Sequence, residues 1–181
     1  LVQQLMTFAR GGEGPHTHVI VPPIVEDVRK LLQQSLPRTI KIETVCAPDP
    51  WPIRADPTQI KQLLLNLSFN ARDAMPRGGQ LRIHVQNTTV DAVMASRHPG
   101  AQAGPHLIMT IRDTGSGIPP DIVGKIFDPF FTTKESGKGT GLGLSTVAGI
   151  VKSHGGFLKV ASEVGQGTEF QLFLPALSSG A

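Results

Sequence analysis

Two glycine clusters place the strongest constraint on how this chain of 181 residues can fold. The first, DTGSG, spans residues 113–117, and the second, GTGLG, spans residues 139–143. Glycine is used where the main chain needs unusual dihedral angles or must approach a ligand closely. The second cluster leads into LSTVAGIVKSH, which reads as a helix, and such a turn offers N–H groups and a positive dipole end to phosphate. On its own, the pattern leaves open a phosphate-binding turn or a surface loop.

The segment 59–75 reads as a second helix, because its apolar residues recur at helical spacing and Asp56 is suited to cap its start. Beside the apolar stripe runs a polar one of Asn66, Asn70 and Asp73, at intervals of four and three. These residue types are neutral to unfavourable inside helices, so their alignment suggests the wall of a polar pocket. Taken in isolation, this helix favours the alternative of an ordinary solvated face.

Four segments together resemble the GHKL ATP-binding superfamily and, within it, the catalytic (HATPase) domain of sensor histidine kinases. NLSFNARDAMPRGG (66–79) resembles the asparagine box of that family, and DTGSGIP (113–119) resembles its first glycine box. IFDPFFTTK (126–134) is similar to the phenylalanine box, and GKGTGLGLS (137–145) is similar to the second glycine box. The boxes occur in the family's order, and the resemblance covers roughly residues 13 to 176.

The resemblance implies an α+β fold, the two-layer α/β sandwich called the Bergerat or GHKL fold, with a mixed sheet, helices on one face and a mobile ATP lid. The chain then divides into residues 1–12, the C-terminal end of a dimerisation-hairpin helix, and residues 13–178, the catalytic ATP-binding domain. An amphipathic tail is the alternative for the first segment. Residues 91–104 read as a solvated hairpin insertion. Alternation and turn signals predict strands at 16–21, 39–45, 51–55, 81–90, 107–112, 157–161 and 168–174, and a helix from 22 to 36.

The resemblance also implies roles for single residues. Asp113 accepts a hydrogen bond from the adenine amino group, and Thr168 supports it. Asn70 ligates the Mg²⁺ that bridges the phosphates of ATP, and Asn66, Asn70 and Lys134 are the catalytic candidates. The aromatic residues of the third box anchor the lid or pack in the core; they are Phe127, Phe130 and Phe131. The full set expected to bind the nucleotide is Asn66, Asn70, Asp73, Asp113, Gly115, Gly117, Ile118, Phe131, Thr133, Lys134, Lys138, Gly139, Thr140, Gly141, Leu142, Gly143, Leu144 and Thr168.

One position separates branches of the superfamily. Its hydrolases carry a general-base glutamate four residues before the metal asparagine, whereas this chain has Asn66, which is not basic. Asn66 therefore disfavours hydrolysis and favours a kinase. Many histidine kinases have a basic residue where this chain has Asp73, with Arg72 one position earlier; this NARDAM form is similar to a branch with nitrogen-regulator-like and hybrid kinases.

The six histidines all lack the acidic neighbour and amphipathic helix of a phosphoacceptor box; they are His16, His18, His84, His98, His106 and His154. The expected function is therefore transfer of the ATP γ-phosphate to a histidine in a dimerisation hairpin that this chain does not contain. The expected partners are that hairpin and the receiver domain of a response regulator, in a homodimeric parent. The alternatives are a nucleotide-sensing module without transfer, or an anti-sigma-type serine kinase.

Composition narrows the remaining classes. The 17 basic residues are scattered and the net charge is +3, which disfavours nucleic acid as a partner. The single cysteine excludes an internal disulfide and is typical of a reducing compartment. We therefore expect this domain to be cytoplasmic, within a parent that is either membrane-anchored or not.

Overall fold

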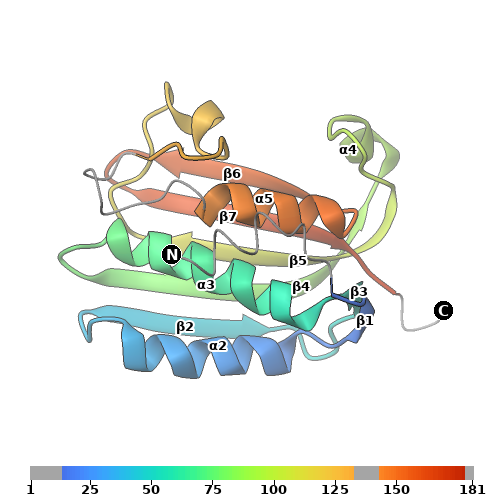
Figure 1. Cartoon of the computed structure of the whole chain (residues 1–181), viewed down its shortest axis with the longest axis horizontal. Helices are drawn as coiled ribbons and strands as arrows, with labels where there is room; N and C mark the ends of the chain where they lie inside the picture. Colours follow the sequence, from blue (N-terminus) through green and yellow to red (C-terminus); the bar gives the residue numbers. More distant parts are fainter. Residues whose placement is uncertain (1–13, 133–142, 178–181) are drawn as a thin grey trace.

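The computed structural model describes residues 14–132 and 143–177. Its centre is a five-stranded mixed sheet in the order β2-β4-β5-β7-β6, in which β2 pairs with β4 in parallel and the other pairs are antiparallel. Helices α2, α3 and α5 cover one face of this sheet (Figure 1). The expected two-layer α/β sandwich is thus confirmed. The strands of the sheet are β2 Ile40–Cys46, β4 Gly79–Val90, β5 Gly104–Asp113, β6 Phe157–Glu163 and β7 Gly167–Pro175.

The remaining elements lie around this centre. The covering helices are α2 Pro22–Ser35, α3 Pro57–Asp73 and α5 Gly143–Ser153. A two-stranded antiparallel sheet pairs β1 Thr17–Val19 with β3 Ile53–Ala55. The hairpin between β4 and β5, expected as an irregular insertion, contains a short helix, α4 Ala92–Ser96. A 3-10 turn, η1 Val123–Lys125, follows the first glycine cluster.

Within the described residues, the predicted strands and helices are present, with ends displaced by a few residues. The strands expected at 16–21 and 51–55 shorten to β1 and β3, because only three residues of each meet across the pair. The helix predicted for residues 1–12 lies outside the described residues, so the division of the chain at that point stays a prediction. Within the described ranges, no helix has both the length and the apolar character that a membrane crossing requires.

Helix α3 begins where the sequence predicts. The Asp56 side chain accepts a hydrogen bond from the backbone N–H of Thr58 at 2.9 Å, and Pro57 occupies the first turn. The backbone N–H of Asp56 donates to Nε2 of His154, at the end of α5, over 3.1 Å. Because Nε2 accepts, Nδ1 carries the proton and donates to the carbonyl of Ile150 at 2.7 Å, which makes His154 neutral. This contact fixes the start of α3 beside the end of α5.

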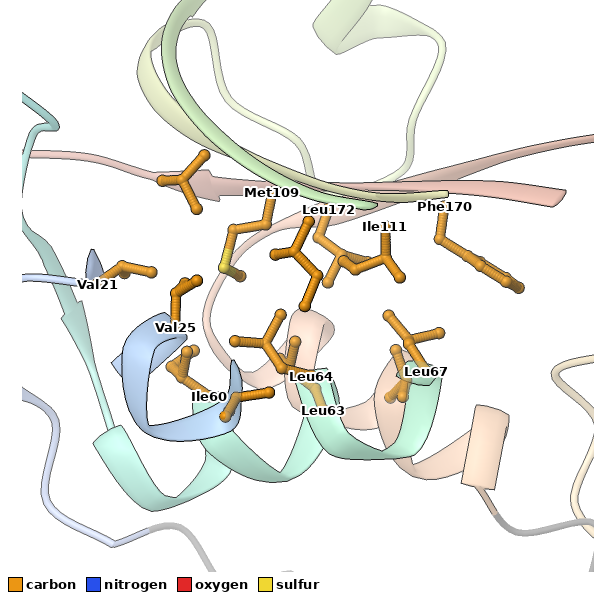
Figure 2. Packing of buried hydrophobic residues seen from close by; sticks show 14 of the residues in the cluster. Val21, Val25, Ile60, Leu63, Leu64, Leu67, Met109, Ile111, Phe170 and Leu172 are labelled. Carbon is orange, nitrogen blue, oxygen red and sulfur yellow. The ribbon is translucent and has the colours of Figure 1, made fainter. Parts of the chain in front are cut away.

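The core lies between the helices and the sheet. Leu63, Leu64 and Leu67 of α3 point toward Met109 and Ile111 of β5 (Figure 2), and all five are at most 2% exposed. Alternation along β5 places every second residue in this layer, which is the pattern that the sequence predicts. The apolar stripe of α3 is therefore the face that packs against the sheet, and the polar residues form a separate stripe beside it.

The central position of α3 can be tested by truncating one leucine. Leu64 is fully buried, so Leu64→Ala removes apolar contacts and leaves a cavity, and we expect it to lower the free energy of unfolding by about 2–5 kcal/mol. Leu31→Ala on α2 is the control, because Leu31 is 39% exposed and its loss should cost no more than about 0.5 kcal/mol. Urea unfolding measures both. Equal losses for the two variants would contradict the packing described here.

Candidate functional site

Asp113 is a buried residue at the C-terminal end of β5, 6% exposed. Its Oδ1 accepts the backbone N–H groups of Gly115, at 2.8 Å, and Thr168, at 3.3 Å. Within the described part of the chain, no residue donates a hydrogen bond to Oδ2. Burial raises the pKa of Asp113, and the two N–H donors oppose that rise. The site thus presents a buried carboxylate oxygen with capacity to accept a further donor.

The first glycine cluster packs between the end of α3 and the turn that joins β6 to β7. The N–H of Ser116 donates to the carbonyl of Ala74, just beyond α3, at 2.9 Å, and the Ser116 carbonyl accepts the N–H of Gly165 at 2.8 Å. Gly117 has φ +76°, and a Cβ there would stand 2.2 Å from the backbone oxygen of Glu163. Only glycine fits this position, so the cluster serves close backbone packing that places Asp113.

The α3 wall of the site is made by two of the three predicted polar residues. Asn66 is 7% exposed, and its Nδ2 donates to the carbonyl of Gly143, the first residue of α5, at 3.4 Å. Asn70 lies near the same residue, with Nδ2 3.8 Å from the position of a Cβ on Gly143. The predicted polar wall therefore faces the start of α5, where the second glycine cluster ends.

Asp73, the third residue of the predicted stripe, is at the end of α3. It is exposed and pairs with Arg72 at 3.1 Å, and the Arg72 guanidinium lies 5.0 Å from the centre of the Phe69 ring. Asp73 is the last residue of α3, at a position seven residues after Asn66 on the same helix. Its expected contact with the nucleotide stays a prediction.

Two of the three phenylalanines of the lid region pack against the core. Phe127 meets Phe170 edge to face, with ring centres 6.3 Å apart, and Phe131 also contacts the core cluster. Phe130 is 65% exposed, with φ +66°, so the alternative that it packs in the core is wrong. It lies in a turn in which the N–H of Phe131 donates to the carbonyl of Asp128 at 3.2 Å, and its expected role in the lid stays a prediction.

The rest of the predicted nucleotide set falls into two groups. Gly143 begins α5, and Leu144 packs against the core cluster. The other residues of the second glycine box and the end of the lid lie outside the described residues; they are Thr133, Lys134, Lys138, Gly139, Thr140, Gly141 and Leu142. Their roles stay predictions.

One residue that the sequence analysis missed connects several parts of the site. Ser162 on β6 accepts the backbone N–H of Ile118 at 2.7 Å and contacts the Thr168 hydroxyl at 2.8 Å. Ile118, in the first glycine box, is 44 residues away in sequence, and Thr168 is six residues further along, on β7. No periodicity or local motif marks such a residue, because its importance depends on the tertiary meeting of three segments.

The described residues fit a nucleotide with an amino group on its base. Asp113 offers an acceptor, and the N–H of Gly115 lies against its carboxylate at 2.8 Å. The amide of Asn70 supplies an oxygen of the kind that Mg²⁺ accepts beside phosphates and water. These groups come from β5 and α3, which meet at one end of the sheet (Figure 1).

Comparison with known proteins agrees with this geometry. Residues 55–178 match the model of the family described as histidine kinase-, DNA gyrase B-, and HSP90-like ATPase. The match covers more than half of the chain, so the chain belongs to this family of ATP-binding proteins. The expected family and fold are thereby confirmed.

The similar proteins narrow the class to sensor kinases. The chain is 42% identical over 177 residues to the sensor kinase CckA of Brucella abortus, and the match covers 98% of this chain and 19% of CckA. The catalytic domain of the histidine kinase ThkA superposes with a TM-score of 0.73 at 27% identity, over 90% of this chain and 97% of that domain. Full-length ShkA in complex with AMPPNP gives a TM-score of 0.76 at 27% identity, over 99% of this chain and 36% of ShkA.

The ionisation of Asp113 yields a prediction for the free protein. Burial raises its pKa in the folded state, so between its ordinary pKa and that raised value the folded chain binds a proton that the unfolded chain has released. The free energy of unfolding of the wild type, relative to Asp113→Asn, which does not titrate, should therefore increase as pH falls through this window.

Urea unfolding of both proteins without nucleotide, from neutral to mildly acidic pH, measures this difference. The asparagine keeps an oxygen for the N–H groups of Gly115 and Thr168, which makes it a close structural match. If the difference in free energy of unfolding between the wild type and Asp113→Asn stays constant, or if the wild type loses stability relative to the variant as pH falls, the raised pKa of Asp113 is contradicted.

Proposed function

We propose that this chain is the ATP-binding catalytic domain of a two-component sensor histidine kinase, which transfers the γ-phosphate of ATP to a histidine on a dimerisation hairpin. The observation that carries the proposal is Asp113, buried at a strand end and held through Oδ1 alone by two backbone N–H groups. The similarity to sensor kinases over nearly the whole chain supports the same function. The chain spans only 19% of CckA, so the activity of the whole protein belongs to this proposal.

Adenine recognition rests on Oδ2 of Asp113. The ionised carboxylate accepts from the exocyclic amino group, and a charge-assisted hydrogen bond of this kind contributes about 1.5–3 kcal/mol. A base with a carbonyl at that position would face the same oxygen with a second acceptor, which leaves both groups unpaired. The site would thus select adenine over a 6-oxo purine.

The polar wall of α3 would hold the phosphates through their cation. Bound Mg²⁺ neutralises phosphate charge and keeps the terminal phosphoryl group in line for transfer. Asn70 would offer its side-chain oxygen to that cation, while Asn66 keeps the start of α5 in place through the Gly143 carbonyl. Residue 66 is an asparagine and has no useful basicity, so this wall positions a phosphoryl group and does not activate water.

The acceptor of the phosphoryl group lies outside this chain in the proposal. The hairpin of a homodimeric parent would present its histidine to the nucleotide, and the receiver domain of a response regulator would take the phosphoryl group from there. ThkA, of similar fold, has been solved in complex with the response regulator TrrA. The domain would act in the cytoplasm, where ATP is abundant.

The metal role of Asn70 can be tested by removing its amide. Asn70→Ala should reduce the gain in ATP affinity that Mg²⁺ provides by about tenfold, or about 1.4 kcal/mol, because a metal ligand is lost while base recognition remains. Asn87→Ala is the matched control, since Asn87 bonds only to the backbone of Trp51 and Asp49 in the described structure. Calorimetric titration with and without Mg²⁺ measures both, and an unchanged Mg²⁺ dependence in Asn70→Ala would remove this residue from the metal site.

Phosphoryl transfer itself is tested in trans. The domain is incubated with γ-labelled ATP, Mg²⁺ and the separately purified, histidine-bearing hairpin of the parent kinase. We expect acid-labile, alkali-stable label on the hairpin, and its loss with Asp113→Asn. ATP binding without transfer would indicate a nucleotide-sensing module instead, and alkali-labile label on serine would indicate a serine kinase.

A further inference from the structure

The hydroxyl of Ser162 joins three segments that surround Asp113. Ser162 Oγ lies 2.7 Å from the N–H of Ile118, 3.1 Å from the carbonyl of Gly167 and 2.8 Å from the Thr168 hydroxyl. Ile118 ends the first glycine box, and Gly167 and Thr168 begin β7. Among the described residues, Ser162 is the only one whose side-chain hydroxyl is hydrogen-bonded both to the first glycine box and to β7.

Counting protons fixes the direction of each bond. The N–H of Ile118 can only donate to Ser162, and the carbonyl of Gly167 can only accept from it. A serine hydroxyl has one proton, which goes to Gly167. In the third contact Ser162 Oγ must therefore accept, and the proton comes from the hydroxyl of Thr168.

Because the Thr168 hydroxyl donates its proton to Ser162, that hydroxyl can only accept a hydrogen bond from a further partner. Its backbone N–H already donates to Oδ1 of Asp113, and its hydroxyl proton is committed to Ser162. Asp113 contributes a second acceptor through Oδ2. Thr168 is 5% exposed, so the orientation of its hydroxyl is set by protein contacts and not by bulk water.

We infer that Ser162 is a positioning residue that holds Thr168 as a hydrogen-bond acceptor beside Asp113, so that the site favours a purine with a donor at its 6-position. This inference rests on the proposed nucleotide-binding function. Without the Ser162 hydroxyl, that of Thr168 is free to rotate and donate. A rotating hydroxyl can pair with a carbonyl at the 6-position, so discrimination against 6-oxo purines should weaken.

The test compares the affinities of ATP and inosine triphosphate, which carries a carbonyl in place of the amino group. Both are titrated by calorimetry into the wild type, Ser162→Ala, Ser162→Thr and Ser96→Ala. Ser162→Thr keeps the hydroxyl. Ser96→Ala removes a hydroxyl that bonds to the Val93 carbonyl on α4, outside the site. Ser162→Cys, with its much weaker hydrogen bonding, replaces Ser162→Ala if that variant does not fold.

We expect Ser162→Ala to reduce the ratio of the two affinities by about threefold to tenfold, the effect of about one net hydrogen bond. Ser162→Thr should restore the ratio, and Ser96→Ala should leave it unchanged. If Ser162 had only a structural role, its loss would lower the affinities for ATP and inosine triphosphate equally. An unchanged ratio of the two affinities in Ser162→Ala therefore overturns the inference, whether or not the affinity for ATP falls. If the folded wild type binds ATP and loses it with Asp113→Asn, the proposed function survives that result; a wild type that binds neither nucleotide overturns both.

Discussion

The structure of the site depends on close backbone packing at the end of β5. The first glycine cluster leaves the sheet there, and it must pass between the end of α3 and the β6–β7 turn. Its carbonyl and N–H groups are paired with Ala74 on one side and Gly165 on the other. A Cβ on Gly117 would stand 2.2 Å from the backbone oxygen of Glu163, and a Cβ on Gly167 would stand 2.0 Å from that of Asp113. Both distances are far shorter than a van der Waals contact. Side chains are therefore excluded, and Asp113 is held where a buried carboxylate can meet a ligand.

Helix α3 links this packing to the stability of the domain. Its leucines fill the core against β5 and β7, while Asn66 and Asn70 on a neighbouring stripe face the start of α5. The contact of Asp56 with His154 joins the start of α3 to the end of α5. The same rigid element thus carries the hydrophobic core and one wall of the site, so the position of the wall is determined by core packing.

Much of this arrangement was predictable from the sequence, because it rests on local signals. Helical spacing and the Asp56 cap located α3, and strand alternation located the sheet. Local signals could not show that Asp73 would be exposed and paired with Arg72 at the end of α3. Nor could they show that Phe130 would be exposed, with its backbone in the left-handed region.

Ser162 marks the limit of sequence reasoning more sharply. Its partners, Ile118 and Thr168, lie on segments whose meeting is decided by the pairing of β6 with β7 and by the path of the first glycine box. A serine in an amphipathic strand looks like any solvated residue. Only the three-dimensional arrangement shows that its hydroxyl has three hydrogen-bond partners within the protein.

The most direct test of the account is an experimental structure of the domain with Mg²⁺ and a non-hydrolysable ATP analogue. The account predicts the adenine amino group within hydrogen-bonding distance of Oδ2 of Asp113, with the cation held between the phosphates and Asn70. A base bound elsewhere, or an Asp113 carboxylate that contacts only the backbone of Gly115 and Thr168 in the complex, would contradict it.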